Sequence, residues 1–359
     1  MYSDSDLERA IAAGALTPEA AQALRDHVAA RRATPAVDEE HFRLLTGFND
    51  IFVAIAAIIL LVAMSWIGAS LRAADDWTGP SPYSGLFVAA TAWGLAEFFT
   101  LRRRMALPSI VLLLAFVGGV FVAVAATAGL VVGESALNDN GSLAALLVAG
   151  SAAVAALSAW LHWLRFRVPI TIAAGAASVV GVMLGTMAAA VGDTEALGDI
   201  LLGFALLLGV GVFLFAMRWD SSDPRRETRR SDVAFWLHLL SAPLIVHPVF
   251  SLLGLTDGSA TVLDAIVVLL VYVGLGLTAL AIDRRALLVS ALAYVLWALS
   301  DVLERFGAVE LSFALTAFVI GSALLLLSAF WHVARRAVVT PLPAGLQSKL
   351  PVLDRTVTA

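Results

Sequence analysis

Ten long apolar stretches follow residue 50, and they constrain this chain more than any other feature. A helix needs about 20 apolar residues to cross the hydrocarbon core of a bilayer. Because hydrocarbon offers no partner to a backbone N–H or C=O, each such stretch is predicted to be helical. The sequence therefore predicts an all-α, polytopic membrane protein with about ten transmembrane helices. The predicted spans are Ile51–Leu71, Tyr83–Leu101, Ala106–Val132, Leu143–Leu164, Val168–Val191, Ile200–Met217, Val233–Leu255, Val262–Ile282, Ala286–Phe306 and Leu311–Val333.

The composition agrees with a membrane protein and excludes thiol chemistry. Hydrophobic residues make up 60% of the chain and charged residues 14%, whereas a soluble domain carries about 25% charged residues. The chain has no cysteine, which excludes disulfides and thiolate catalysis. Arginine far outnumbers lysine and alanine is abundant. That usage is typical of GC-rich bacterial genomes, so we expect the protein in a bacterial inner (plasma) membrane.

The distribution of positive charge predicts the orientation. Of the 23 Lys and Arg residues, all but Arg72 and Arg305 precede the first span, follow the tenth, or lie in the loops after spans two, four, six and eight. The positive-inside rule then places both termini in the cytoplasm, which requires an even number of spans. Topology and anionic lipid alone explain arginines beside a membrane, so we expect the bilayer as partner and no nucleic acid.

A short polar segment precedes the first span. Residues 3–33 are predicted to form a small cytoplasmic helical hairpin, in which Gly14 ends the first helix in a left-handed conformation and Thr17 caps the second. A segment of this size cannot bury a core of its own, so it packs on the membrane domain, on a second copy or on a cytoplasmic partner. A proline-rich tail, predicted to be weakly ordered, follows the last span. The predicted domains are the hairpin and its acidic linker, residues 1–45, the transmembrane domain, residues 46–336, and the tail, residues 337–359.

A basic turn recurs on the predicted cytoplasmic side. Residues 102–109 and 165–170 each combine arginines with a proline that opens the next span, and residues 283–290 repeat the basic turn further on. The larger loop 218–232 fills the remaining place. The pattern predicts that spans two to nine form tandem helical hairpins. A true duplication and simple convergence both explain it, because any helical hairpin needs such a turn.

The seventh predicted span is the most unusual. Pro243 and Pro248 each remove one backbone hydrogen bond from its interior and predict a kinked helix. His238, Ser241 and His247 are the local candidates to satisfy the carbonyls freed by the prolines. Nine residues at about 100° each place the two histidines on opposite faces, so they are not expected to share a metal.

Two interpretations of the polar residues near the outer face stay open. His247, Asp264 and Asp301 lie at similar predicted depths and would together form a polar vestibule with a titratable histidine. In the alternative, Asp264 caps a helix, Asp301 pairs with Arg305 one turn later, and His247 bonds a carbonyl freed by proline.

Other polar and small residues have simpler interpretations. Glu97 is predicted to pair with Arg102 and its neighbours at the end of span two. Glycines in spans three, five and six, such as Gly119 and Gly209, predict close contact between helices, with a pore lining as the alternative. Gly-x-Ser-x-Gly, His-Glu-x-x-His and phosphate-loop motifs are absent, so we expect neither an enzyme nor a bound cofactor or metal.

The Gly14–Ala20 turn, the basic turns and the segment Asp232–Pro248 resemble those of bacterial multi-pass inner-membrane proteins of unknown function with a short N-terminal helical hairpin domain. The resemblance implies an uncharacterised inner-membrane protein and supplies no catalytic residues. Two functions remain open: a permease-like protein for a small or lipidic solute, and a non-catalytic scaffold or sensor whose N-terminal hairpin binds a cytoplasmic partner. A polar cavity beside His247 would favour the first, and a solidly packed bundle the second.

Overall fold

The computed structural model describes residues 10–24, 48–71, 78–224, 226, 228–252, 262–285, 288, 296 and 312–353. The chain divides into two units, one of Met1–Arg43 with Asp354–Ala359 and the other of Leu44–Leu353. Every regular element in the described residues is a helix, as the sequence predicts. The helices of the larger unit are α3 (Phe48–Ser70), α4 (Pro82–Ala96), the π-helical turn η1 (Glu97–Arg102), α5 (Ala106–Val132), α6 (Glu134–Asp139), α7 (Gly141–Phe166), α8 (Ile170–Val191), α9 (Leu197–Ser221), α10 (Arg229–Leu252), α11 (Val262–Ile282), α13 (Ser312–Ala329), α14 (Trp331–Val339) and α15 (Ala344–Gln347).

Within these described residues, seven helices are long and apolar enough to cross a membrane: α3, α4 with η1, α5, α7, α8, α9 and α10. They occupy the first seven predicted spans, and the predicted bounds of the third span coincide with those of α5. The eighth predicted span coincides with α11. The ninth, Ala286–Phe306, lies outside the described residues except for Leu288 and Leu296, so the count of ten remains a prediction.

The tenth predicted span differs from the structure. A single helix was expected over Leu311–Val333, but α13 ends at Ala329 and α14 leaves it at an angle of 76°. The cause lies in the first residues of α14. Trp331 is buried there, and its indole N–H donates a hydrogen bond to an aspartate of another segment. The bend therefore turns a polar, arginine-bearing helix away from the direction of α13.

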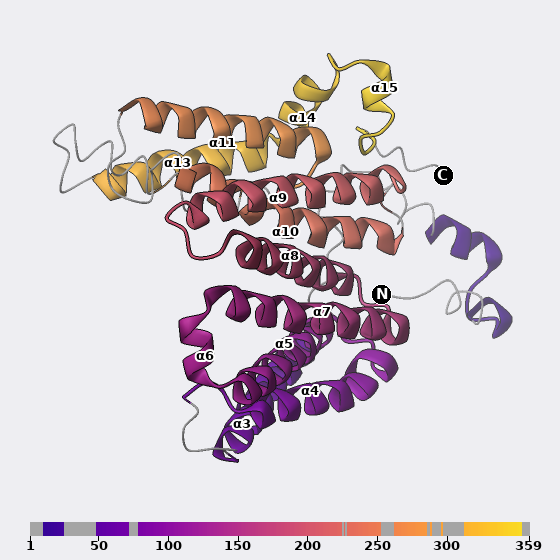
Figure 1. The fold of residues 1–359 in the computed structure, drawn as a ribbon. Coiled ribbons are helices and arrows are strands. Elements are labelled where there is room, and N and C mark those ends of the chain that lie inside the picture. The colour runs from indigo at the N-terminus through magenta and orange to yellow at the C-terminus, as the bar shows by residue number, and fades with distance from the viewer. Residues whose placement is uncertain are drawn as a thin grey trace. The chain divides into compact units, whose positions relative to one another are not determined.

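Helices adjacent in sequence pack closely. α4 packs on α5, α7 on α8 and α9 on α10, and Figure 1 shows these helices in the spatial order α7, α8, α10, α9, so that α10 lies between α8 and α9. Glycine permits the closest approaches. A Cβ atom on Gly119 of α5 would lie 2.8 Å from the carbonyl oxygen of Gly85 in α4, and one on Gly209 of α9 would lie 2.9 Å from that of Leu244 in α10. The prediction of close contact is confirmed at Gly119 and Gly209 but not at Gly118 and Gly211, where an added Cβ atom would meet nothing within 4 Å.

The outer surface of these helices is apolar. Phe52 and Trp66 of α3, and Leu207 and Leu214 of α9, are among many large hydrophobic side chains that the packed helices leave exposed. A protein in water rarely exposes apolar area on this scale, whereas lipid tails favour it. Length, composition and surface together indicate an integral membrane protein.

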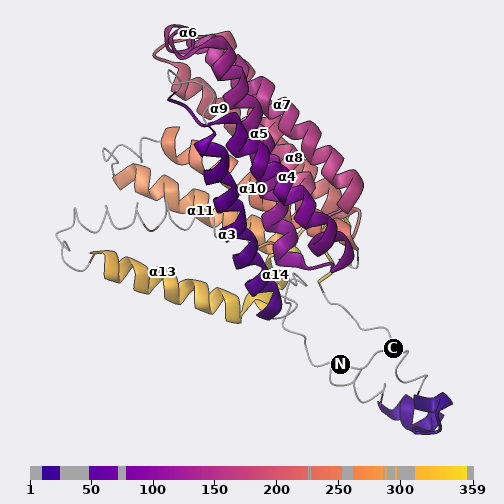
Figure 2. The same ribbon diagram turned by 90° about the horizontal axis from the view of Figure 1, so that it is seen from below.

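The four basic turns share a backbone feature. Among its described residues, each contains one non-glycine residue with a positive φ, namely Arg104, Arg167, Arg226 and Asp283, with φ between 54° and 57°. An L-residue in this conformation costs about 1–2 kcal/mol, so surrounding contacts must hold it there. We call the end of the helices that carries these turns the arginine-rich end. α6 lies between α5 and α7 at the end of those helices away from their basic turns, and Figure 2 shows it far from α14.

In the N-terminal unit the described residues are 10–24, and they are helical over 10–12 and 18–24. Gly14 has φ +69°, and the Thr17 hydroxyl oxygen accepts a hydrogen bond from the N–H of Ala20 at 3.2 Å. Both local predictions, the left-handed glycine and the threonine cap, are confirmed.

The segment after Arg336 is more ordered than the sequence suggests, as far as Leu353. α14 continues to Val339, α15 follows, and Leu350 is buried. The proline content suggested an extended tail, but the segment packs because an arginine of α14 holds its backbone carbonyls, a contact that composition cannot reveal.

Candidate functional site, a buried ionic network

Three charged or titratable side chains meet at the arginine-rich end. Asp220 in the last turn of α9 accepts hydrogen bonds from Arg284, which follows α11, at 2.6 Å to Oδ1 and 3.4 Å to Oδ2. His238 Nε2, from α10, lies 2.8 Å from Asp220 Oδ2. The three side chains are almost fully enclosed, with 1%, 2% and 0% of Asp220, Arg284 and His238 exposed. The cluster therefore joins α9, α10 and the turn after α11 through one carboxylate.

The geometry fixes the tautomer of His238. A carboxylate oxygen and an unprotonated ring nitrogen both accept hydrogen bonds, so a contact of 2.8 Å requires a proton on Nε2. The neutral ring then carries its lone pair on Nδ1. That atom is buried and has no hydrogen-bond partner within the described part of the chain. The ring of Phe213 packs edge-on against the imidazole, with centroids 5.2 Å apart, and supplies no acceptor or donor.

A second carboxylate continues the network. Asp283, next to Arg284 in the chain, accepts a hydrogen bond from Arg226 Nη1 at 3.0 Å and one from the indole N–H of Trp331 at 2.7 Å. Arg335 Nε lies 3.8 Å from the same carboxylate. Asp283 is the left-handed residue of its turn, so these contacts are those that hold the strained backbone.

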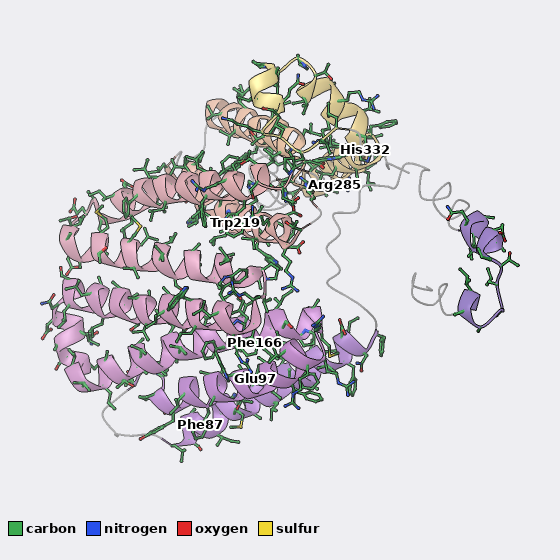
Figure 3. All side chains as sticks on the ribbon, turned by 90° about the vertical axis from the view of Figure 1, so that its right-hand side faces the viewer. Phe87, Glu97, Phe166, Trp219, Arg285 and His332 are labelled. Atoms are coloured by element: carbon green, nitrogen blue, oxygen red, sulfur yellow. The ribbon has the colours of Figure 1, made fainter. Side chains whose placement is uncertain are left out.

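Arg335 links this network to the C-terminal segment. Its guanidinium donates hydrogen bonds to the backbone carbonyls of Pro351, at 2.6 Å, and Val352, at 3.1 Å. The N–H of Val352 in turn reaches the carbonyl of Pro224, in the loop between α9 and α10. Figure 3 shows Arg285 and His332 close together where α14 meets the turn after α11, and the Arg285 guanidinium lies 4.8 Å above the Trp331 ring.

The buried charges of the network balance. Among the described residues, Asp220, Asp223 and Asp283 are opposed by Arg226, Arg284 and Arg335, each with little exposed side-chain area. The net charge of these buried side chains is zero only when His238 is neutral. Removing one partner from such a network leaves an uncompensated buried charge, at a cost of about 3–5 kcal/mol.

Glu97 has a different partner from the predicted one. Arg165 of α7 binds it through Nε and Nη2 at 2.9 and 2.8 Å, and Figure 3 shows Glu97 beside Phe166 at the end of α7. Arg102 was the expected partner because it follows Glu97 closely in sequence. Glu97 and Arg102 are the first and last residues of the π-helical turn, and the contact of Glu97 with α7 is a tertiary one. This pair is partly exposed, unlike the network.

A second buried histidine was not singled out from the sequence. His162 of α7 packs among the rings of Trp93, Phe116 and Phe166, and its Nδ1 lies 3.3 Å from the Thr171 hydroxyl. No motif marks it. A histidine near the end of an apolar helix, three residues before Arg165, was the only available signal.

The predicted vestibule is not tested. His247 lies on an exposed face of α10, whereas His238 is buried. Asp301 and the side chain of Asp264 lie outside the described residues. The described side chains contain no group of three or more His, Cys, Asp or Glu placed to hold a metal ion.

The predicted kink residues lie within one continuous helix. Pro243 is exposed and Pro248 buried, both inside α10. Ser241 donates a hydrogen bond to the carbonyl of His238, rather than to a carbonyl freed by proline, and His238 is committed to Asp220. The suggestion that these two side chains replace the bonds lost to proline was therefore wrong.

The arginines of the network were attributed to topology and lipid alone, and that interpretation was incomplete. Arg226, Arg284 and Arg335 turn inward to carboxylates or backbone carbonyls. The available signal was the presence of acidic residues among these arginines on the predicted basic side, at Asp220, Asp223 and Asp283. Comparison with protein-family models, with curated proteins and with solved structures found no match for this chain.

Proposed function

We propose that this protein is a non-catalytic integral membrane module, a sensor or scaffold, whose spanning helices are coupled to segments at the arginine-rich end. In this proposal both termini lie in the cytoplasm of a bacterium, the membrane is the inner one, and residues 3–33 provide the contact for a cytoplasmic partner. Tandem hairpins, about ten spans in all, form the membrane domain.

The ionic network is the observation that carries the proposal. Burying an ionisable side chain in or beside a membrane span costs free energy, so such residues usually have a functional role. Here the buried charges bind one another and hold the C-terminal segment, through Arg335 and the carbonyls of Pro351 and Val352. A change in the arrangement of α9, α10 and α11 would therefore alter how this segment is held, which is what a membrane sensor requires.

The chain provides its own reporter for this coupling. Lys349 is its single lysine and lies beside the docked residues, so a lysine-specific protease cuts only there. Cleavage needs the local backbone to open. In the full-length protein in detergent, Arg335→Ala should accelerate cleavage at Lys349 several-fold, because it releases two backbone carbonyls. Asp220→Asn, which does not touch the segment directly, should also accelerate it.

The matched control is Arg336→Ala, which removes the neighbouring, exposed arginine of α14 and should leave the cleavage rate close to that of the parent protein. If Arg335→Ala is cleaved no faster than Arg336→Ala, the segment is not held by the network and the proposed coupling is wrong.

A permease-like role is the second candidate. It is favoured by His247, which lies on a face of α10 that the network does not use. Proton movement into liposomes that contain the purified protein, followed with a trapped pH-sensitive dye and lost in His247→Ala, would support this role over the first.

A further inference from the structure

We infer that His238 is a proton-binding site, and that proton uptake at Nδ1 releases the C-terminal segment from the arginine-rich end. The inference rests on the proposed function, because it assigns a signal to the coupled network. It begins from the one atom of the Asp220 cluster that has a lone pair and no donor in the described residues.

Nδ1 is the atom that can accept a proton. Nε2 already carries one, which it shares with the Asp220 carboxylate at 2.8 Å. A proton from water would therefore bind the Nδ1 lone pair and convert the imidazole to imidazolium, while the Nε2–H bond to Asp220 persists. Histidine is the side chain whose ordinary titration falls near neutral pH.

The packed site does not suit the imidazolium. The new Nδ1–H would be a buried donor without an acceptor in the described residues, next to the Phe213 ring. The balanced network would also gain one positive charge. The charged groups around His238 are Asp220 of α9, Arg284 after α11 and, in the loop between α9 and α10, Arg226. α8, which also packs on α10, contains no ionisable residue.

Arg284 is the group that the added charge displaces. It binds the same carboxylate as His238, so an imidazolium there repels it and competes for Asp220. Arg284 adjoins Asp283, whose carboxylate holds Trp331 and Arg335. Movement of this short turn therefore reaches Arg335, and through it the carbonyls of residues 351 and 352. Each step joins buried groups that are hydrogen-bonded, adjacent in the chain or, for Arg335 and Asp283, in an ion pair at 3.8 Å.

The absence of cysteine in the chain allows a direct test. Leu350→Cys places a single thiol at a buried position of the docked segment, and Ser348→Cys places one at an exposed position two residues earlier. The rate of maleimide labelling is measured for each full-length variant in detergent. The ratio of the two rates cancels the effect of pH on the thiol itself. The ratio should rise several-fold as the pH falls from about 8 to about 5.5.

His238→Gln is the matched control, because the Gln amide can donate to Asp220 but does not titrate in this range. In this variant the ratio should stay low at every pH. An unchanged ratio in the His238 protein, or an equal rise in His238→Gln, would overturn the inference.

The outcomes separate this inference from the proposed function. Arg335→Ala in the Leu350→Cys background should raise the ratio at all pH values. If Arg335→Ala raises it while pH has no effect, the segment is held as proposed and His238 is not its trigger. If Arg335→Ala has no effect either, the proposed function itself is wrong.

Discussion

Two ion pairs at the arginine-rich end show how differently the same chemistry can act in one protein. Glu97 and Arg165 meet with 35% and 51% of their side chains exposed, whereas Asp220 and Arg284 meet with 1% and 3% exposed. The first pair joins two helices that other contacts already position. The second joins α9 to the turn after α11, with His238 and Asp283 attached to it. The two pairs have similar N–O distances, so the degree of burial is what makes the first replaceable and the second necessary for the arrangement of the helices.

Asp220→Ala should produce the largest effect. It leaves Arg284 without its carboxylate in a buried site, so the free energy of unfolding should fall by about 3–5 kcal/mol. Glu97→Ala removes a partner that solvent already screens, so its effect on the free energy of unfolding should be far smaller. Unfolding of the purified protein in mixed micelles, driven by a denaturing detergent, measures both. Equal losses would show that burial does not distinguish the two pairs.

Gly119→Ala should cost an intermediate amount. The new methyl group would lie within 3 Å of the backbone of α4, so α4 and α5 must separate, at a cost of about 1–3 kcal/mol. Gly118→Ala is the control, since a Cβ at Gly118 meets nothing within 4 Å. The same unfolding assay applies. Equal losses for Gly119→Ala and Gly118→Ala would show that the close approach of α4 to α5 does not depend on Gly119.

Glu134 should give the smallest effect, and one that depends on pH. Hydrogen bonds from the Thr78 hydroxyl, at 2.7 Å, and the Thr78 N–H lower the pKa of this carboxyl below its ordinary value of 4.5. Because the folded pKa is the lower one, the contact stabilises the fold above that ordinary value and is lost as the pH falls through the lowered pKa. Thr78→Val removes the hydroxyl, so the pKa of Glu134 should rise. Titration of the carboxyl by NMR measures it, and an unchanged value would show that the hydroxyl is not the cause.

The sequence predicts the parts of this fold that depend on local pattern. The bounds of α5 and α11, the left-handed Gly14 and the Thr17 cap follow from apolar length and capping chemistry within a few residues. The Gly119 contact follows from the absence of a side chain. In each case the information lies within one helix or one turn.

The ionic network could not be predicted in the same way. Asp220 lies 18 residues from His238 and 64 residues from Arg284. Each of the three has an ordinary local explanation. Asp220 lies at a helix end, His238 lies within an apolar span, and Arg284 belongs to a predicted cytoplasmic turn, where the positive-inside rule accounts for arginine. Only the packing of α9 on α10, and the return of the chain after α11, brings them to one point. The bend between α13 and α14 escaped prediction for the same reason, since its cause is a bond from Trp331 to Asp283.

Arg335 binds the C-terminal segment through the main-chain carbonyl oxygens of residues 351 and 352, and the side chain of Val352 is exposed. Because these contacts use main-chain oxygens and the Val352 side chain is exposed, they do not depend on which amino acid stands at position 352, whereas Pro351 is buried. The contacts are sensitive instead to spacing, since one residue added or removed between α15 and Pro351 would carry both carbonyls out of reach. Over evolution we therefore expect the amino acid at position 352 to vary while the length of the connection is conserved.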